Sequence, residues 1–176
     1  MTQDFNPFTD RLSRDIRNKL SVSLAEAINM RSLEPVLAVA DHFLAGNIPA
    51  DHQHYITSRL QRYESALEKV PATADDHLAI AVILWDLGLF FEVHEILEPP
   101  WMKAQGDRKL LLQALIRAAG VYINLELGYT DRAAKISGKA LPVLTRLEQE
   151  LKMNMNVGEL IAALQELTPE APHIGL

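Results

Sequence analysis

The sequence contains no cysteine. This absence excludes disulfide bonds, thiolate zinc sites, iron–sulfur clusters and cysteine nucleophiles together. Glycine and proline are also scarce, with 8 and 9 residues among 176, too few for a collagen-like or low-complexity chain. Basic residues are outnumbered, 17 against 23 acidic residues, so the net charge is −6. A broad basic surface is therefore not expected, and we predict that the protein does not bind nucleic acid.

Long hydrophobic runs are missing as well. Residues 1–15 are polar and lack the apolar core of a signal peptide. The two most apolar stretches, residues 78–91 and 110–127, are interrupted by polar residues such as Asp86 and Arg117, which is typical of buried helices rather than bilayer spans. With 48% hydrophobic and 23% charged residues, the composition indicates a soluble globular protein. We expect it to be cytoplasmic, without a membrane partner.

What the sequence does contain is helix-forming residues. Alanine and leucine dominate, runs of β-branched residues are rare, and no segment alternates apolar and polar residues as a strand does. The pattern predicts an all-α protein, an antiparallel multi-helix bundle of about eight helices. Breakers and capping residues divide the chain. The expected helices begin at Thr9 or Asp10, Ser32, Pro49, Thr73 to Asp76, Leu89, Gly106, Thr130 and Asn156.

Two stretches, residues 70–75 and 153–156, have the composition of linkers. They predict an N-terminal helical extension over residues 1–72, a helical core over 73–153, and a C-terminal helix and tail over 154–176. Within the core, Pro99 and Pro100 remove two consecutive backbone donors. We expect the chain to unwind or bend sharply there, before Trp101.

A distinctive motif lies in the core. Residues 87–98 read LGLFFEVHEILE and are followed by Trp101, and residues 112–122 read LQALIRAAGVY. Together these segments resemble the bacterial and archaeal Domain of Unknown Function 309 family, whose first motif is G-x-[FY]-[FY]-E-x-H-E-x-L-E-x-x-W. The resemblance covers roughly residues 80–145 and implies an all-helical fold. It also implies the label that the family sometimes carries, predicted metal-dependent hydrolase. The chain departs from the family at Pro99 and Pro100, and at Ala114, where glycine is usual.

One interpretation of the motif is a metal site. His94 and Glu98 are four residues apart on a helix, so they share a face at a spacing that suits two metal ligands. Glu95 stands where H-E-x-x-H proteases carry their general base, but Glu98 replaces the second histidine of that signature. The resulting hypothesis is a hydrolase with His94 and Glu98 as ligands and Glu95 as the catalytic residue. A divalent metal ion is the one cofactor that these residues suggest.

The other interpretation is a buried polar cluster that orders helix packing or orients a small ligand. Gln113, Arg117 and Asn124 form a polar stripe on an otherwise apolar helix, and such a stripe needs partners. We expect Arg117 to pair with Glu98 or Glu95, and Gln113 or Asn124 to pair with His94. The expected cluster comprises His94, Glu95, Glu98, Trp101, Gln113, Arg117 and Asn124.

This second interpretation favours a binding or assembly module, either a homo-oligomer or a protein that binds a protein partner. The segment that begins GYTDRAA at residue 128 also resembles half of a tetratricopeptide repeat, which favours a scaffold. A separate group, Asp51, His52 and His54, could bind an ion. We interpret it instead as an acidic helix start followed by surface histidines.

Overall fold

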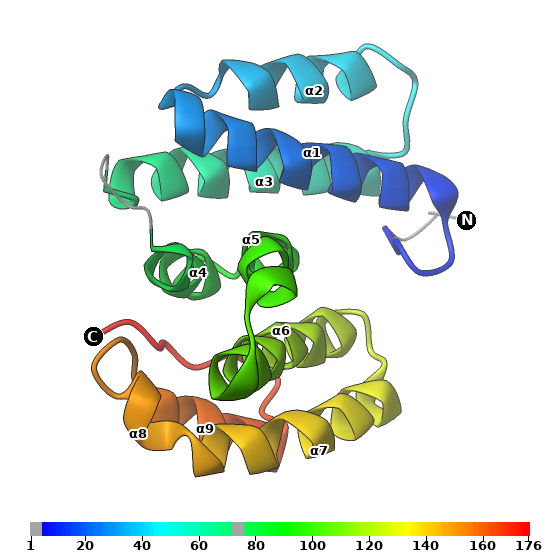
Figure 1. The fold of residues 1–176 in the computed structure, drawn as a ribbon. Helices are drawn as coiled ribbons and strands as arrows, with labels where there is room; N and C mark the ends of the chain where they lie inside the picture. The colour runs from blue at the N-terminus through cyan, green and yellow to red at the C-terminus, as the bar shows by residue number, and fades with distance from the viewer. Residues whose placement is uncertain (1–4, 72–75) are drawn as a thin grey trace. The chain divides into compact units, whose positions relative to one another are not determined.

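The computed structural model describes residues 5–71 and 76–176 (Figure 1). Over these residues the chain forms nine helices and no strand, which confirms the all-α prediction. Eight of the helices are the expected ones, and the additional one is the single turn Glu148–Leu151. The chain divides into two compact units, Met1–Ala72 and Thr73–Leu176. The predicted start of the fourth helix at Thr73 lies outside the described residues.

The first unit contains three helices, each of which packs against the other two. They are α1 (Arg11–Met30), α2 (Glu34–Leu44) and α3 (Ala50–Lys69). Asp10 begins α1, because its carboxylate accepts the backbone N–H of Ser13 at 2.6 Å and so caps the free donors of the first turn. The core of this unit is formed by fully buried side chains: Ile16, Leu20, Val36, Ile56 and Tyr63.

The second unit is built around α6, which packs against both α5 and α7. Its helices are α4 (His77–Asp86), α5 (Phe90–Lys103), α6 (Gly106–Glu126), α7 (Thr130–Arg146), α8 (Glu148–Leu151) and α9 (Val157–Glu166). Nine residues of α6 are buried, as expected for a helix that is apolar nearly all round. Trp85, Phe90 and Tyr122 pack ring against ring, with centroids 5.1 to 5.3 Å apart, and join α4, α5 and α6.

The two prolines of α5 do not end the helix. Pro99 and Pro100 lie inside it, and the backbone N–H of Ala104 bonds to the carbonyl of Pro100 at 3.0 Å. The prediction that the chain unwinds before Trp101 is therefore wrong. Proline forbids the hydrogen bond of its own nitrogen, but its fixed φ is compatible with a helix. Because the helix continues, Trp101 follows His94 by seven residues and lies on the same face.

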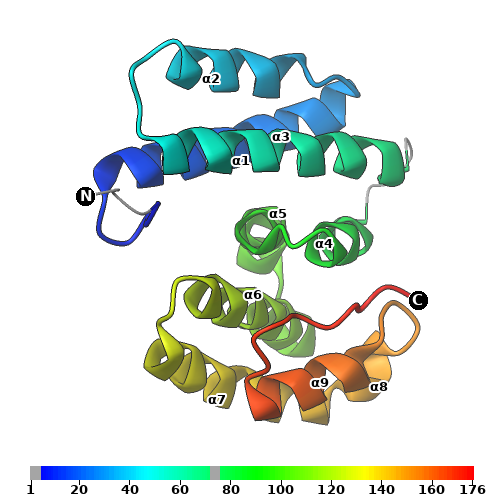
Figure 2. The ribbon, with the colours of Figure 1, turned by 180° about the vertical axis from the view of Figure 1, so that it is seen from behind.

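The last residues of the chain pack onto the second unit. The carboxylate of Asp86 accepts the backbone N–H groups of Ile174 and Gly175, at 2.8 and 3.0 Å. The indole Nε1 of Trp85 donates to the carbonyl of Pro172 at 2.9 Å. Ile174 is only 2% exposed, so this tail completes the core of the unit. Figure 2 shows the tail, in red, running from the end of α9 across the unit.

Candidate functional site

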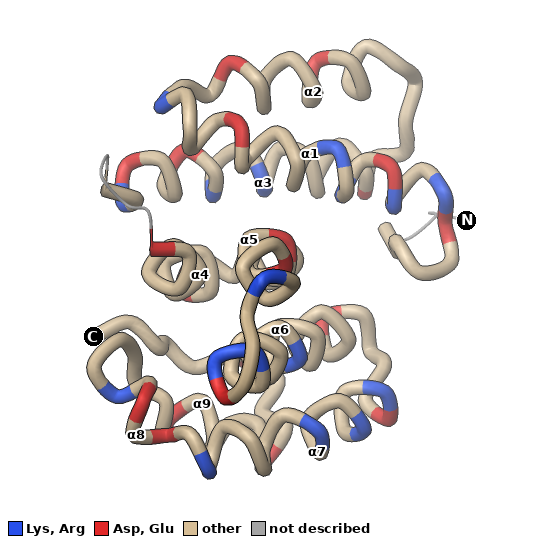
Figure 3. The backbone as a smooth tube through the Cα atoms, viewed as in Figure 1, with Lys and Arg blue, Asp and Glu red and all other residues tan. Residues whose placement is uncertain are grey.

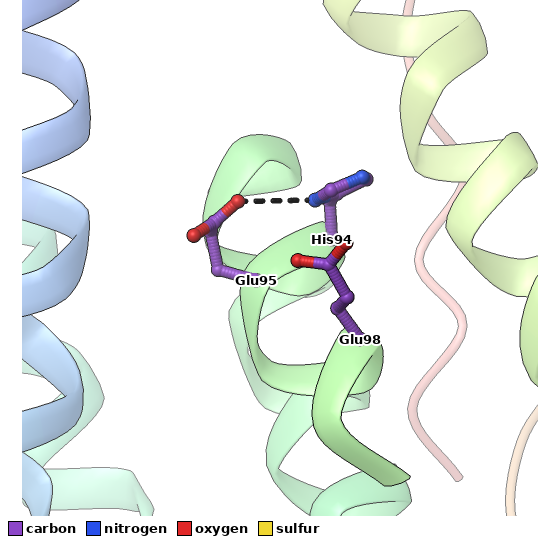
Figure 4. A group of neighbouring side chains, drawn as sticks. All are labelled: His94, Glu95 and Glu98. Carbon is purple, nitrogen blue, oxygen red and sulfur yellow. Dashed lines mark hydrogen bonds and ion pairs between the residues drawn. The ribbon is translucent and has the colours of Figure 1, made fainter. Parts of the chain in front are cut away.

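The His94 cluster consists of His94, Glu95 and Glu98, which project from consecutive turns of α5 (Figure 4). One ligand atom from each residue can be chosen so that all three lie within 4.8 Å of one another. The imidazole Nδ1 of His94 lies 3.1 Å from Oε1 of Glu95. Both side chains are about one-third exposed, at 35% and 37%, so an ion or ligand in solvent can reach them.

The donor set of this cluster fits a divalent cation. One imidazole nitrogen and two carboxylates supply the three protein ligands that a catalytic zinc site uses, and such ligands also suit manganese. Phe91 supports the arrangement, because its ring stacks on that of His94 with centroids 6.1 Å apart and an interplanar angle of 8°. Glu95 also lies closer to His94 than the helical period alone suggests. Adjacent residues of a helix lie about 100° apart around its axis, yet these two side chains converge.

The polar residues of α6 do not join this cluster. Arg117 donates from Nη1 to the carbonyl of Lys139 on α7, at 3.4 Å, and Asn124 donates to the carbonyl of Gly120 in its own helix, at 2.7 Å. These partners differ from the predicted ones, Glu98 or Glu95 and His94. The reason is the rotation of α6, since a Cβ at Gly120 would lie 3.9 Å from Ile136 of α7. The polar stripe therefore faces α7.

Two further predicted residues, Gln113 and Trp101, are half-buried. Gln113 lies on α6. Trp101 lies on α5, and the ammonium of Lys109 lies 5.5 Å from the centre of its ring. The indole Nε1 of Trp101 is inaccessible and has no hydrogen-bond acceptor among the described residues. Trp101 therefore serves as an apolar wall at the end of α5 rather than as a donor to His94.

His52 is buried, so the prediction of a surface histidine is wrong for this residue. Its side chain is 1% exposed, and Nε2 lies 2.9 Å from the hydroxyl of Ser13 and 3.1 Å from Asp10. The hydrogen bonds from the Ser13 hydroxyl and backbone N–H lower the pKa of Asp10 to about 2, with a smaller contribution from His52. The three residues join the start of α1 to α3. Sequence spacing gave no signal for this contact between distant segments.

The sequence analysis also missed a groove between α1 and α2, here called the α1–α2 groove. It is open, has a volume of about 670 Å³ and is lined by Asn18, Lys19, Val22, Ser23, Glu26, Met30, Glu34, Pro35, Ala38 and Val39. Val22 is 64% exposed and Met30 is 55% exposed. Of the eleven residues of α2, only Val36 and Ala40 are buried. The sequence of α2, EPVLAVADHFL, could have indicated the groove, because it has more apolar residues than one buried stripe requires.

No helix in the described part of the chain is both long and apolar enough to cross a membrane. Among the curated proteins and the solved structures, the chain has no match. A match exists among protein families, to the model described as Domain of unknown function (DUF309), over residues 78–136. This range begins in α4, contains the His94 cluster and ends in α7. About a third of the chain is matched, all of it in the second unit, and over residues 78–136 the chain is therefore similar to the DUF309 family.

Proposed function

We propose that this protein is a helical binding and assembly module whose first unit holds a partner helix in the α1–α2 groove. The observation that carries the proposal is the apolar lining of this groove, which includes the exposed Val22 and Met30 and the half-buried Val39. Contiguous apolar surface costs solvation free energy, and in folded proteins it commonly marks an interaction site. A groove between two helices suits the apolar face of a third helix.

The chemistry of α2 supports this assignment. Pro35, Ala38 and Val39 line the groove from α2. Leu37 and Leu44 are 46% and 38% exposed and lie outside the groove lining, so α2 carries further apolar residues that its own unit does not bury. Pro35 stands in the first turn of α2, where proline fixes the start of a helix without removing a needed hydrogen bond. The sequence thus builds a defined helix and leaves its apolar side uncovered.

A photo-crosslinking amino acid at position 22 tests this proposal in cells that naturally contain the protein. We expect a covalent adduct at position 22 and none at Gln61, an exposed residue of α3 that serves as the control. The mass of the adduct identifies the occupant. Equal, weak labelling at both positions would show that the α1–α2 groove binds nothing and would overturn the proposal.

A second candidate function is metal-dependent hydrolysis at the His94 cluster, and the gathering of its three ligand atoms within 4.8 Å favours it. His94 and Glu98 would hold a divalent ion, which would supply Lewis-acid polarisation of a bound substrate and lower the pKa of a bound water. Glu95 has two possible roles. Either it is the third ligand, or it accepts the Nδ1–H of His94, orients the imidazole and serves as a proton acceptor.

Variants of the cluster distinguish these roles. For a metal site, His94→Ala removes zinc or manganese binding measured by calorimetry and elemental analysis, while His77→Ala, an exposed histidine of α4, leaves it unchanged. Glu95→Gln weakens binding about 10- to 100-fold if Glu95 is an orienting partner, and by more if it is a ligand. If the wild-type protein binds neither ion, the candidate is rejected, and the binding module stands alone.

A further inference from the structure

We infer that the occupant of the α1–α2 groove is a second copy of this chain, with the two α1 helices antiparallel about a two-fold axis near Val22. This inference rests on the proposed binding function and names its partner. It is carried by charges on the edge of the groove that complement themselves when the helix is reversed.

The exposed face of α1 carries a regular stripe. Asp15, Lys19, Val22, Glu26 and Met30 are separated by four, three, four and four residues, so they lie along one side of the helix. All five are exposed. Val22 is at the centre of the stripe, with a positive charge on one side and a negative charge on the other. Asp15, beyond Lys19, pairs with Arg11 of its own helix at 3.7 Å, so the charges that flank Val22 are Lys19 on one side and Glu26 on the other.

Three charges of the stripe and groove have no ion-pair partner within residues 5–71 and 76–176. This holds for Lys19 and Glu26 on α1 and for Glu34 on α2. The ammonium of Lys19 lies 5.3 Å from the centre of the Phe43 ring, at the end of the groove away from Glu34. One end of the groove thus carries a cation and the other end carries two carboxylates.

An antiparallel second copy satisfies both ends at once. When α1 is rotated about an axis midway between residues 22 and 23, Lys19 comes opposite Glu26 of the second copy, and Glu26 comes opposite its Lys19. Val22 then meets its own counterpart at the axis. A parallel pair would place Lys19 against Lys19 and Glu26 against Glu26, which is repulsive. Closed two-fold symmetry is the commonest arrangement of identical chains.

The remaining charges of α1 favour the same direction. Figure 3 shows that the basic residues of α1 gather in its N-terminal half, and Glu26 is the one charged residue of its C-terminal half. This distribution opposes the helix dipole of α1, whose N-terminus is already partly positive. Asp10 caps the first turn, and an antiparallel neighbour adds the partly negative end of its own α1 beside the basic half of the helix.

The area that α1 and α2 can bury limits the affinity of the dimer. Helices of 20 and 11 residues, about 30 and 16 Å long and about 10 Å wide, together offer roughly 450 Å² per copy. The total of roughly 900 Å² lies below the about 1,200 Å² of a standard stable interface. We therefore expect a reversible dimer that forms with rising concentration.

Sedimentation equilibrium of the purified full chain tests the inference, over about 1 μM to about 1 mM. We expect a monomer–dimer equilibrium that weakens with added salt. Lys19→Glu and Glu26→Lys should each raise the dimer Kd at least about tenfold, because each creates two like-charge contacts. The double variant Lys19→Glu with Glu26→Lys should return the dimer Kd to near the wild-type value. Within one chain these residues are seven positions apart, so restoration requires contact between copies.

Lys135→Glu on α7 is the matched control, because it makes the same charge change on an exposed residue of the second unit. Circular dichroism shows whether each variant remains helical. A wild-type protein that stays monomeric throughout, or a dimer indifferent to both single charge changes, overturns the inference. If position 22 nevertheless crosslinks to a different protein in cells, the binding function stands and only the second copy is rejected. If position 22 crosslinks to nothing, both fail.

Discussion

The Asp10 carboxylate is a small group on which the start of α1 depends. It accepts both the backbone N–H and the hydroxyl of Ser13 at 2.6 Å, and it lies 3.1 Å from the buried imidazole of His52. These bonds favour the ionised carboxylate and hold its pKa at about 2 instead of 3.8. A carboxylate with a depressed pKa in the folded protein stabilises it at pH values above the unfolded pKa, and the stabilisation disappears as the pH falls toward the folded pKa.

Stability should therefore decrease between about pH 4 and pH 2, in part through Asp10. Asp10→Asn keeps a capping side chain without the charge, so it should flatten this part of the pH profile of urea midpoints. Asp10→Ala removes the cap and should cost about 1 kcal/mol at neutral pH. Asp51→Asn is the control, because it removes the same charge in the first turn of α3. An unaltered acid profile in Asp10→Asn would contradict the role given to this carboxylate.

At the scale of elements, the tail over residues 172–175 tolerates substitution poorly at one position, Gly175. A Cβ at Gly175 would lie 2.5 Å from Oδ2 of Asp86, the same oxygen that accepts the Gly175 N–H. Gly175→Ala should therefore displace the tail and destabilise the second unit by about 1–3 kcal/mol. Gly138→Ala is the matched control, because Gly138 lies in α7 with open space around its Cα.

Thermal melts and tryptophan emission provide the measurements. Displacing the tail breaks the bond from the Trp85 indole to Pro172, so the emission of Gly175→Ala should shift to longer wavelength. Gly138→Ala should instead raise the melting temperature slightly, since alanine favours a helix by about 1 kcal/mol over glycine. Equal melting temperatures for the two variants would mean that the tail contributes no stability.

Elements also show how far the sequence predicts the fold. Helix starts followed from local chemistry, as with the caps at Asp10 and Asp76 and with Pro35 in a first turn. Local chemistry failed at Pro99 and Pro100, where packing of α5 against α4 and α6 outweighs two missing hydrogen bonds.

In the candidate site, too, contacts within one helix can be predicted from the sequence, whereas contacts between helices cannot. The His94 cluster lies within five residues of one helix, so the helical period brings its members together. The partners of Arg117 and Asn124 depend on how α6 is rotated between its neighbours, which one helix does not reveal. His52 and Ser13 meet across 39 positions, and the α1–α2 groove depends on the packing of two helices.

At the scale of the whole molecule, the two compact units each have their own core. Leu20 is fully buried in the first and Leu112 is 1% exposed in the second. Leu20→Ala should cost the first unit about 2–5 kcal/mol and leave hydrogen exchange in α6 unchanged. Leu112→Ala should destabilise the second unit by a similar amount and leave hydrogen exchange in α1 unchanged. Faster exchange in both units from either change would show that the chain unfolds as one cooperative whole.

The position of Ile174 has a consequence for how the protein is made. A ribosome releases the chain from its N-terminus, and domains generally fold in that order. The first unit has all of its helices once α3 has emerged. The core of the second unit is complete only after Ile174 has emerged, because that side chain packs in the core beside Trp85 and Leu115. The helices that contain residues 78–136 therefore remain accessible to proteases and chaperones until the end of the chain has emerged.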